Sequence, residues 1–358
     1  MSDEQLGKQR ARIDALDLEI LRLVNERASV ARSIGDLKAD GVIYRPEREA
    51  QVLRRLSDAN AGPLPGKAVA QLFTEIISAC RALETALTVA CLGPKGTFSE
   101  EAVTKHFGRS VEPALCNSID EVFRSVESDA CCYGVVPVEN STEGAIGRTL
   151  DLLLATPLRI GGEILLPVHQ CLLSKAPHLG AVVRVFSHAQ SLAQCNRWLN
   201  QNLARAERVP VASNAEAARL AAGDASAAAI AGRSASEHYG APLLVSNIED
   251  EPNNTTRFVV IGAQDVPPSG RDKTSMVLGA RNRPGAIHEL LAPLARNQVC
   301  MTRLESRPSR TGLWEYVFFV DVEGHQMDAA VARAFEEMRA LAGFLKILGA
   351  YPVAIDRA

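Results

Sequence analysis

Residues 1–88 carry an apolar seam that is too long for this segment to bury by itself. Its members recur every three or four positions, which predicts one helix over residues 3–39. They are Ile13, Leu16, Ile20, Leu23, Val30, Ile34 and Leu37. At 1.5 Å per residue this helix is about 50 Å long, whereas a compact unit of this size is only about 30 Å across. We therefore expect an intertwined helical dimer.

Cations on this helix are candidate ligands for a small anion. Arg27 occupies the one gap in the seam, and Lys38 lies eleven residues later on almost the same face. Arg10 lies seventeen residues before Arg27 and about 100° off that face, so it suits a site in the partner subunit. The alternative is that these cations are solvated and that Arg27 snorkels from the seam.

Two shorter helices complete this segment. The first opens at residues 44–47 with a proline in its first turn, and a Gly- and Pro-rich stretch at 60–66 separates it from a helix over about 67–88. Arg48 and Glu49 head the first helix, and Glu84 lies on an apolar stripe of the second. Cations and a buried carboxylate that converge inside a small bundle suit a compact dicarboxylate ligand.

The helical segment resembles the all-helical chorismate mutase family over nearly all of residues 5–88. The matching stretches are IDALD at 13–17, NER at 25–27, Lys38, PERE at 46–49 and ISACRALE at 77–84. The implied reaction is the Claisen rearrangement of chorismate to prephenate, which needs no nucleophile and no metal. Glu49 would hydrogen-bond the substrate hydroxyl and Glu84 the ether oxygen, while Arg45 stands where some relatives carry Asp. The implied ligands of the carboxylates and ether oxygen are Arg27, Lys38, Arg48 and the partner subunit's Arg10.

Residues 89–266 change to an α/β pattern, in which short apolar runs alternate with helical stretches. Polar residues follow three of these runs and mark junctions where a helix N-terminus can bind an anion. They are Thr97, Asn140, Ser141, Ser187 and Gln190. The same residues are also compatible with ordinary helix caps, since Thr97 has capping-box spacing to Glu100.

Thr256 and Arg257 begin the last apolar run of the central segment. The arginine could pair with a carboxylate while the threonine places a hydroxyl over a reacting ring. The alternative is a solvated arginine at the start of a strand.

Together these central motifs resemble prephenate dehydratase from about residue 89 to residue 261. GPKGTFSEEA, GVVPVENSTEGAI, SHAQSLAQC and NTTRF occur in that order. The resemblance implies two α/β lobes like those of periplasmic binding proteins, with prephenate in the cleft. Thr256 is then the main catalytic candidate, supported by Arg257 and Phe258. The polar cleft positions are Thr97, Asn140, Ser141, Ser187 and Gln190. Loss of CO₂ and the ring hydroxyl makes the ring aromatic, so no base, metal or cofactor is required.

The last segment, residues 271–358, follows a linker-like stretch at 266–270 and has a β-α-β-β-α-β pattern. This pattern predicts a ferredoxin-like fold, for which a purely structural role is the default. It resembles the ACT domains fused to prephenate dehydratases. Their phenylalanine-binding motif is intact in Glu305, Ser306, Arg307 and Pro308, and the companion motif matches in part in Gly285, Ala286, Ile287 and His288. The resemblance implies that phenylalanine binds between two ACT domains and inhibits the dehydratase.

The three resemblances occur in the order found in the bifunctional chorismate mutase–prephenate dehydratase family. We therefore expect three domains: an all-helical mutase at 1–88, a two-lobed dehydratase at 89–266 and an α+β ACT domain at 271–358. One alternative is a non-catalytic amino-acid sensor built from a binding-protein-like module and an ACT domain. Another is a mutase fused to prephenate dehydrogenase, although the GxGxxG fingerprint of such an enzyme is missing.

Composition excludes several other classes of protein. The net charge of −3 gives no general attraction to nucleic acid or acidic membranes. The charged N-terminus lacks a signal peptide, and no run of about 18 apolar residues could span a membrane. The eight cysteines form no CxxC pair, which favours reduced thiols over disulfides or a metal site. We expect a cytoplasmic homodimer or higher oligomer without metal or cofactor.

Overall fold

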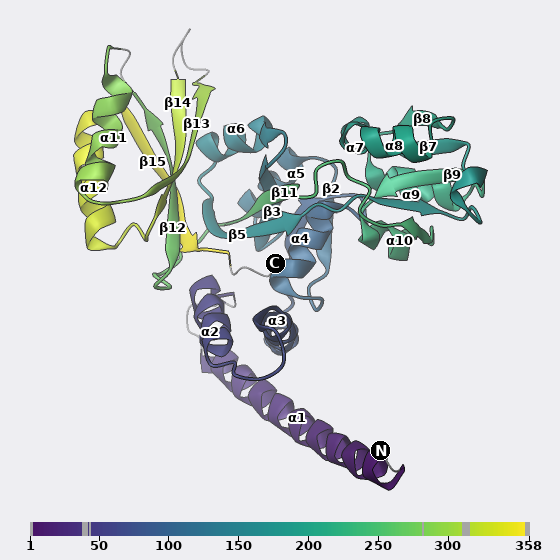
Figure 1. Ribbon diagram of the computed structural model, residues 1–358. Helices are drawn as coiled ribbons and strands as arrows, with labels where there is room; N and C mark the ends of the chain where they lie inside the picture. The colour runs from purple at the N-terminus through teal and green to yellow at the C-terminus, as the bar shows by residue number, and fades with distance from the viewer. Residues whose placement is uncertain (1–2, 38–41, 43, 281–282, 310–315, 355–358) are drawn as a thin grey trace.

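The computed structural model describes residues 3–37, 42, 44–280, 283–309 and 316–354. A helical part, a central part with two sheets and a C-terminal part with one sheet follow one another along the chain (Figure 1). Among these residues we find no helix with the length and hydropathy of a membrane span.

The helical part has the three predicted helices. They are α1 (Asp3–Leu37), α2 (Pro46–Asp58) and α3 (Gly66–Ala82). α1 projects away from the rest of the chain (Figure 1) and meets α3 only near its own C-terminal end, where Gly35 faces Glu84. Its seam is consequently bare: Ile13, Leu16 and Ile20 are between 52% and 57% exposed. Lys38 lies outside the described residues.

The central part has two lobes, as expected from the sequence. The first lobe is a sheet in the order β2-β1-β3-β11-β5, with β4 paired to β3. Its strands are β1 (Val89–Leu92), β2 (Pro113–Cys116), β3 (Tyr133–Asn140), β4 (Gly144–Ala145), β5 (Arg159–Pro167) and β11 (Thr255–Gly262). Its helices are α4 (Phe98–Phe107), α5 (Ile119–Glu127) and α6 (Gly147–Ala155). α4 packs on one face of the sheet, and α5 and α6 pack on the other.

The second lobe is a sheet in the order β10-β6-β9-β7-β8. Its strands are β6 (Cys171–Ser174), β7 (Arg184–Ser187), β8 (Glu207–Pro210), β9 (Ala227–Ala231) and β10 (Leu243–Val245). Its helices are α7 (Ala189–Gln194), α8 (Asn196–Asn202), α9 (Asn214–Ala222) and α10 (Arg233–Tyr239), with a short 3₁₀ turn at Leu179–Ala181. The chain enters this lobe after β5 and returns through β11, so two connections join the lobes.

The C-terminal part has the predicted β-α-β-β-α-β order and an antiparallel sheet, β13-β14-β12-β15. Its elements are β12 (Asp272–Gly279), α11 (Ala286–Arg296), β13 (Met301–Pro308), β14 (Tyr316–Glu323), α12 (Ala329–Leu341) and β15 (Phe344–Pro352). Both helices cover the outer face (Figure 1). The inner face shares a core with α5 and α6 of the first lobe. The approach of β15 to β5 needs Gly349, because a Cβ there would lie 2.2 Å from the Ile160 carbonyl oxygen.

Candidate active sites

The first candidate site is a pocket between α1 and the facing ends of α2 and α3. It is lined by Arg27, Ala31, Ile34, Arg45, Arg48, Glu49, Ile77, Cys80, Arg81 and Glu84. The fold therefore brings together four of the six residues predicted for the mutase: Arg27, Arg48, Glu49 and Glu84. Arg10 lies elsewhere, because seventeen residues of helix separate it from Arg27 by about 25 Å.

Two observations show that this pocket suits an anion. The Nη1 atom of Arg27 is buried without a hydrogen-bond partner among the described residues. A buried guanidinium nitrogen normally has a partner, so a ligand is the natural acceptor. Arg48 supplies a second cation to the same pocket. Glu84 is held at the wall because α1 and α3 approach closely at Gly35, where a Cβ would lie 2.9 Å from the Glu84 Cγ.

Arg81 is a lining residue that the sequence interpretation missed. Its side chain is 5% exposed, and its Nη1 donates to the Glu49 Oε1 at 2.6 Å. Its spacing contained a signal, because residues three or four apart share a helix face, and Ile77 lies four residues before Arg81 and Glu84 three residues after it. That face therefore carries Arg81 as well as Glu84 among its apolar residues.

The second candidate site lies where β3 and β11 end side by side. Asn140 donates from Nδ2 to the Thr256 Oγ1 and to the Asn254 Oδ1, both at 2.8 Å. The amide orientation of Asn140 is fixed, because its Oδ1 accepts the backbone N–H of Thr142 at 3.0 Å. Thr256 therefore accepts a hydrogen bond from Asn140, which leaves its own proton available for a ligand. All three residues of this Thr256–Asn140–Asn254 cluster are less than 10% exposed.

A chain of polar side chains leads from this cluster into the second lobe. Asn254 donates to Gln194, which also accepts from Gln170, and Gln170 reaches Ser191. Ser191 accepts from Asn214, to which the predicted Ser187 donates at 2.9 Å. The Oε1 atom of Gln170 is buried and has no partner among the described residues, so it can accept a hydrogen bond from a ligand. The sequence interpretation did not single out Gln170 or Asn254.

Three other predicted cleft residues serve local structure. Thr97 caps α4, where its hydroxyl accepts the Glu100 N–H. Ser141 bonds the backbone at Asn253 and Thr255 and so joins the ends of the two strands. Gln190 is exposed, and its backbone N–H meets the His188 ring.

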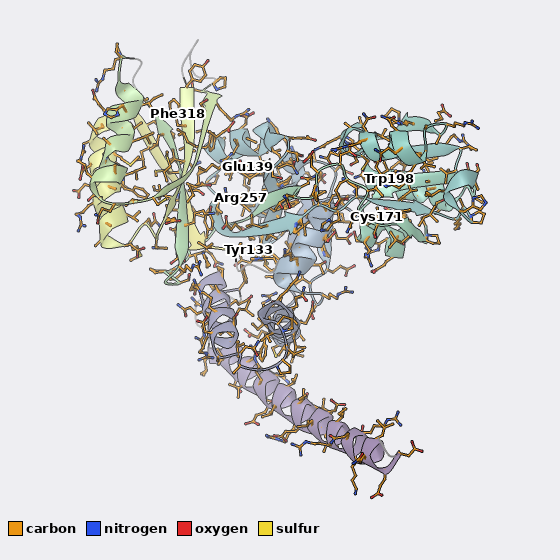
Figure 2. All side chains as sticks on the ribbon, in the orientation of Figure 1. Tyr133, Glu139, Cys171, Trp198, Arg257 and Phe318 are labelled. Atoms are coloured by element: carbon orange, nitrogen blue, oxygen red, sulfur yellow. The ribbon has the colours of Figure 1, made fainter. Side chains whose placement is uncertain are left out.

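The Arg257 side chain does not share a face of the sheet with the Thr256 side chain, contrary to our expectation. Successive side chains of a strand point to opposite faces, so Thr256 and Phe258 share one face of β11 and Arg257 occupies the other. Phe258 is 2% exposed in the core around α4, rather than lining the cleft. Figure 2 shows Arg257 between the first lobe and the C-terminal sheet, away from the second lobe.

The Arg257 guanidinium is committed to partners on that far face. Its Nε donates to Glu163 at 2.9 Å, its Nη1 to Asp321 at 2.5 Å and its Nη2 to the Tyr351 hydroxyl at 2.8 Å. Burial lowers the pKa of Arg257, but Tyr351, Asp321 and Glu163 outweigh burial and raise it above its usual value. Burial also raises the pKa of Tyr351. Arg257 therefore ties β11 to the C-terminal sheet.

The third candidate site lies at one end of the C-terminal sheet. Its edge strand β13 ends with Glu305, Ser306, Arg307 and Pro308. Arg307 pairs with Val317 of β14, which in turn pairs with Gly279 at the end of β12. Gly285, Ala286, Ile287 and His288 begin α11 just after that end of β12. The two motifs thus share one end of the sheet. Arg307 contacts Asp151 of α6 at 3.2 Å, and its Nε is buried without a partner among the described residues.

Comparison with known proteins supports this division of the chain. Residues 9–85 match the family model of chorismate mutase type II, residues 89–266 that of prephenate dehydratase and residues 274–340 that of the ACT domain. A bifunctional chorismate mutase/prephenate dehydratase from Neisseria gonorrhoeae is 52% identical over 99% of this chain and 98% of its own length. The chain belongs to this bifunctional family.

Other relatives match about three quarters of this mutase–dehydratase chain. A prephenate dehydratase from Mycobacterium sp. (strain JLS) is 38% identical over 74% of this chain and 88% of its own. The crystal structure of a prephenate dehydratase from Arthrobacter aurescens in complex with L-Phe matches with a TM-score of 0.69 and 31% identity. It covers 76% of this chain and 92% of that one. The bifunctional family excludes both the non-catalytic sensor and the fusion with prephenate dehydrogenase.

Proposed function

We propose that the pocket between α1, α2 and α3 binds chorismate and converts it to prephenate. The buried Arg27 Nη1 carries this assignment, because it has no hydrogen-bond partner within the described part of the chain and an anionic ligand would supply one. Arg27 and Arg48 would hold carboxylates, together with Lys38. Glu84 would face the ether oxygen, whose bond breaks, and Glu49 the substrate hydroxyl. The rearrangement is unimolecular, so holding the reactive conformer is the main task of these residues.

We further propose that this site is completed by a second copy of the chain. Arg10 would supply the remaining cation, and the bare seam of α1 would supply the interface. Support comes from the exposure of Ile13, Leu16 and Ile20, since apolar side chains in such a row normally lie against a partner. A second copy matches the seam because the surfaces of a two-fold dimer are self-complementary.

For the dehydratase reaction we propose that Thr256 hydrogen-bonds the departing ring hydroxyl of prephenate. Asn140 fixes the threonine oxygen as an acceptor, so the threonine proton is directed at the substrate. A threonine hydroxyl is a poor acid, so its contribution is a positioned hydrogen bond to developing negative charge. Aromatisation of the ring drives loss of CO₂. Gln170 and Ser187 would line the opposite wall of the cleft.

These proposals imply three units with limits at residues 1–88, 89–266 and 271–358. Support comes from the gaps between α3, which ends at Ala82, and β1, which begins at Val89, and between β11 and β12. The test is one coupled assay: the whole protein should form phenylpyruvate from chorismate, with prephenate as the intermediate. If it makes phenylpyruvate only when prephenate is supplied, the mutase assignment is wrong.

For regulation we propose that phenylalanine binds at one end of the C-terminal sheet, where the last residues of β13 lie near the start of α11. Arg307→Ala should then weaken phenylalanine binding about tenfold or more, which is the size of a lost charge-assisted contact. Uninhibited dehydratase turnover should stay within a few-fold of wild type. Calorimetry with phenylalanine measures the affinity. Arg296→Ala is the matched control, because Arg296 pairs with Glu337 on the outer helices, away from β13. Unchanged affinity in Arg307→Ala would contradict the assignment.

A further inference from the structure

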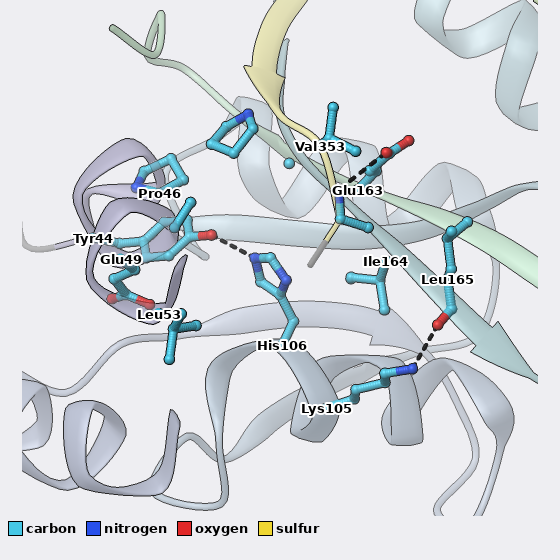
Figure 3. Close-up of a pocket in the computed structure, with 14 residues that line it drawn as sticks. Tyr44, Pro46, Glu49, Leu53, Lys105, His106, Glu163, Ile164, Leu165 and Val353 are labelled. Atoms are coloured by element: carbon cyan, nitrogen blue, oxygen red, sulfur yellow. Dashed lines mark hydrogen bonds between the residues drawn. The ribbon is translucent and has the colours of Figure 1, made fainter. Parts of the chain in front are cut away.

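The mutase helices are fastened to the dehydratase lobe at two places. Tyr44, just before α2, is 2% exposed and belongs to the same core as Phe107 and Tyr133 of the first lobe. Its hydroxyl meets the His106 Nε2 at 2.5 Å (Figure 3). The second place is the C-terminal end of α4, where Gly108 lies so close to Ser78 of α3 that a Cβ would be 2.4 Å from the Ser78 Cβ.

Arg81 bridges these two domains with one guanidinium group. Its Nη1 donates to Glu49 at 2.6 Å, and its Nη2 donates at 2.7 Å to the backbone carbonyl of Phe107, the last residue of α4. The guanidinium carbon lies 5.5 Å from the centre of the Tyr44 ring and 5.6 Å from that of Phe107. The side chain is therefore held by two aromatic rings and a helix-end carbonyl, one ring and the carbonyl belonging to the dehydratase lobe.

We infer that Arg81 is a positioning residue of the mutase reaction, through which the dehydratase domain fixes the geometry of Glu49. This inference rests on the proposed role of Glu49 at the substrate hydroxyl. A carboxylate on a free side chain samples several rotamers, and an ion pair with a buried arginine selects one of them. A carboxylate has about four acceptor positions, so the bond to Arg81 leaves capacity for the substrate.

The planar fork of arginine is essential to this role. Its two terminal nitrogens reach the Glu49 carboxylate and the Phe107 carbonyl at the same time, while the guanidinium carbon stays within 5.6 Å of both ring centres. A lysine presents a single point charge and cannot reproduce that geometry. Displacement of a catalytic group by about 1 Å can cost about 100-fold in rate. The contact should therefore affect kcat more than KM.

The test measures mutase and dehydratase turnover separately in whole-chain variants, with chorismate and with added prephenate. Arg81→Met should lower mutase kcat at least tenfold, with KM changed by less than threefold, and Arg81→Lys should fall between it and wild type. Dehydratase turnover should stay within twofold and so report that each variant is folded. Arg54→Met is the matched control, because Arg54 of α2 bonds the linker at Ser269 rather than the pocket. It should leave the mutase unchanged.

The double variant Arg81→Met, Glu49→Gln decides whether Arg81 acts through Glu49. It should be no slower than Glu49→Gln alone, since removal of the carboxylate removes the effect of its anchor. Wild-type mutase kcat in Arg81→Met, or losses that multiply in the double variant, would overturn the inference and leave the site assignment standing. Full mutase activity in Glu49→Gln would overturn the assignment of Glu49 itself.

Discussion

Thr256→Ala should abolish phenylpyruvate formation while prephenate accumulates from chorismate. The Asn140 amide donates to the Thr256 oxygen and so leaves the threonine proton for the substrate, and loss of one positioned donor typically costs about 10²–10³ in turnover. The pocket proposed for the mutase lies between α1, α2 and α3, and its lining residues do not include Thr256, Asn140 or Asn254. Chorismate consumption and phenylpyruvate appearance, followed in the same sample, measure both steps.

Thr255→Ala is the matched control for this variant. Thr255 precedes Thr256 on β11, where its backbone N–H donates to the Ser141 hydroxyl and its carbonyl accepts the Ser141 N–H. Its side chain points to the opposite face of the strand. Dehydratase turnover should therefore be close to wild type. Equal loss of both activities in folded Thr256→Ala protein would contradict the assignment of the second reaction to this cluster.

Arg10→Ala and Arg27→Ala should each reduce mutase turnover by about 10² or more, and their heterodimer should recover activity. If each site takes Arg10 from one subunit and Arg27 from the other, the heterodimer has one intact site and one that lacks both arginines. It should show about half of wild-type mutase activity. Co-expression with two different affinity tags isolates the heterodimer, and both parents should retain full dehydratase turnover.

The complementation also tests the dimer. A heterodimer as inactive as its parents would show that both arginines act within one chain or that Arg10 has no role. Arg12→Ala is the control, because Arg12 lies on the same exposed stretch of α1 as Arg10 and the proposed site does not use it. Its homodimer should have normal mutase turnover.

Helical periodicity accounts for only part of what the sequence could predict in the first site. Spacing placed Arg27 in a helix seam and Glu84 on an apolar stripe, whereas the resemblance to the chorismate mutase family was needed to group them with Arg48 and Glu49. The same pattern contains Arg81, but it does not indicate that Arg81 donates to the Phe107 carbonyl. The Phe107 carbonyl belongs to another domain, and a backbone atom leaves no trace in a sequence pattern.

The position of Arg257 could not be read from its motif. In any strand the side chains of Thr256 and Arg257 point to opposite faces. The role of Arg257 depends on which residues cover its face. Here Asp321 and Tyr351 cover it, and they follow Arg257 by 64 and 94 residues. The short motif therefore combines three surroundings, with Thr256 hydrogen-bonded to Asn140, Arg257 at the C-terminal sheet and Phe258 in the core.

Tyr44 has a consequence for how such a protein can evolve. It is a mutase residue by position, yet it fills part of the dehydratase core, so deletion of the helical part would leave a void there. Loss of a buried aromatic side chain costs about 3–5 kcal/mol, which is comparable to the whole stability margin of many domains. A chain without the helical part would need another side chain in that space. Selection for a stable dehydratase domain would therefore act on Tyr44 independently of mutase catalysis.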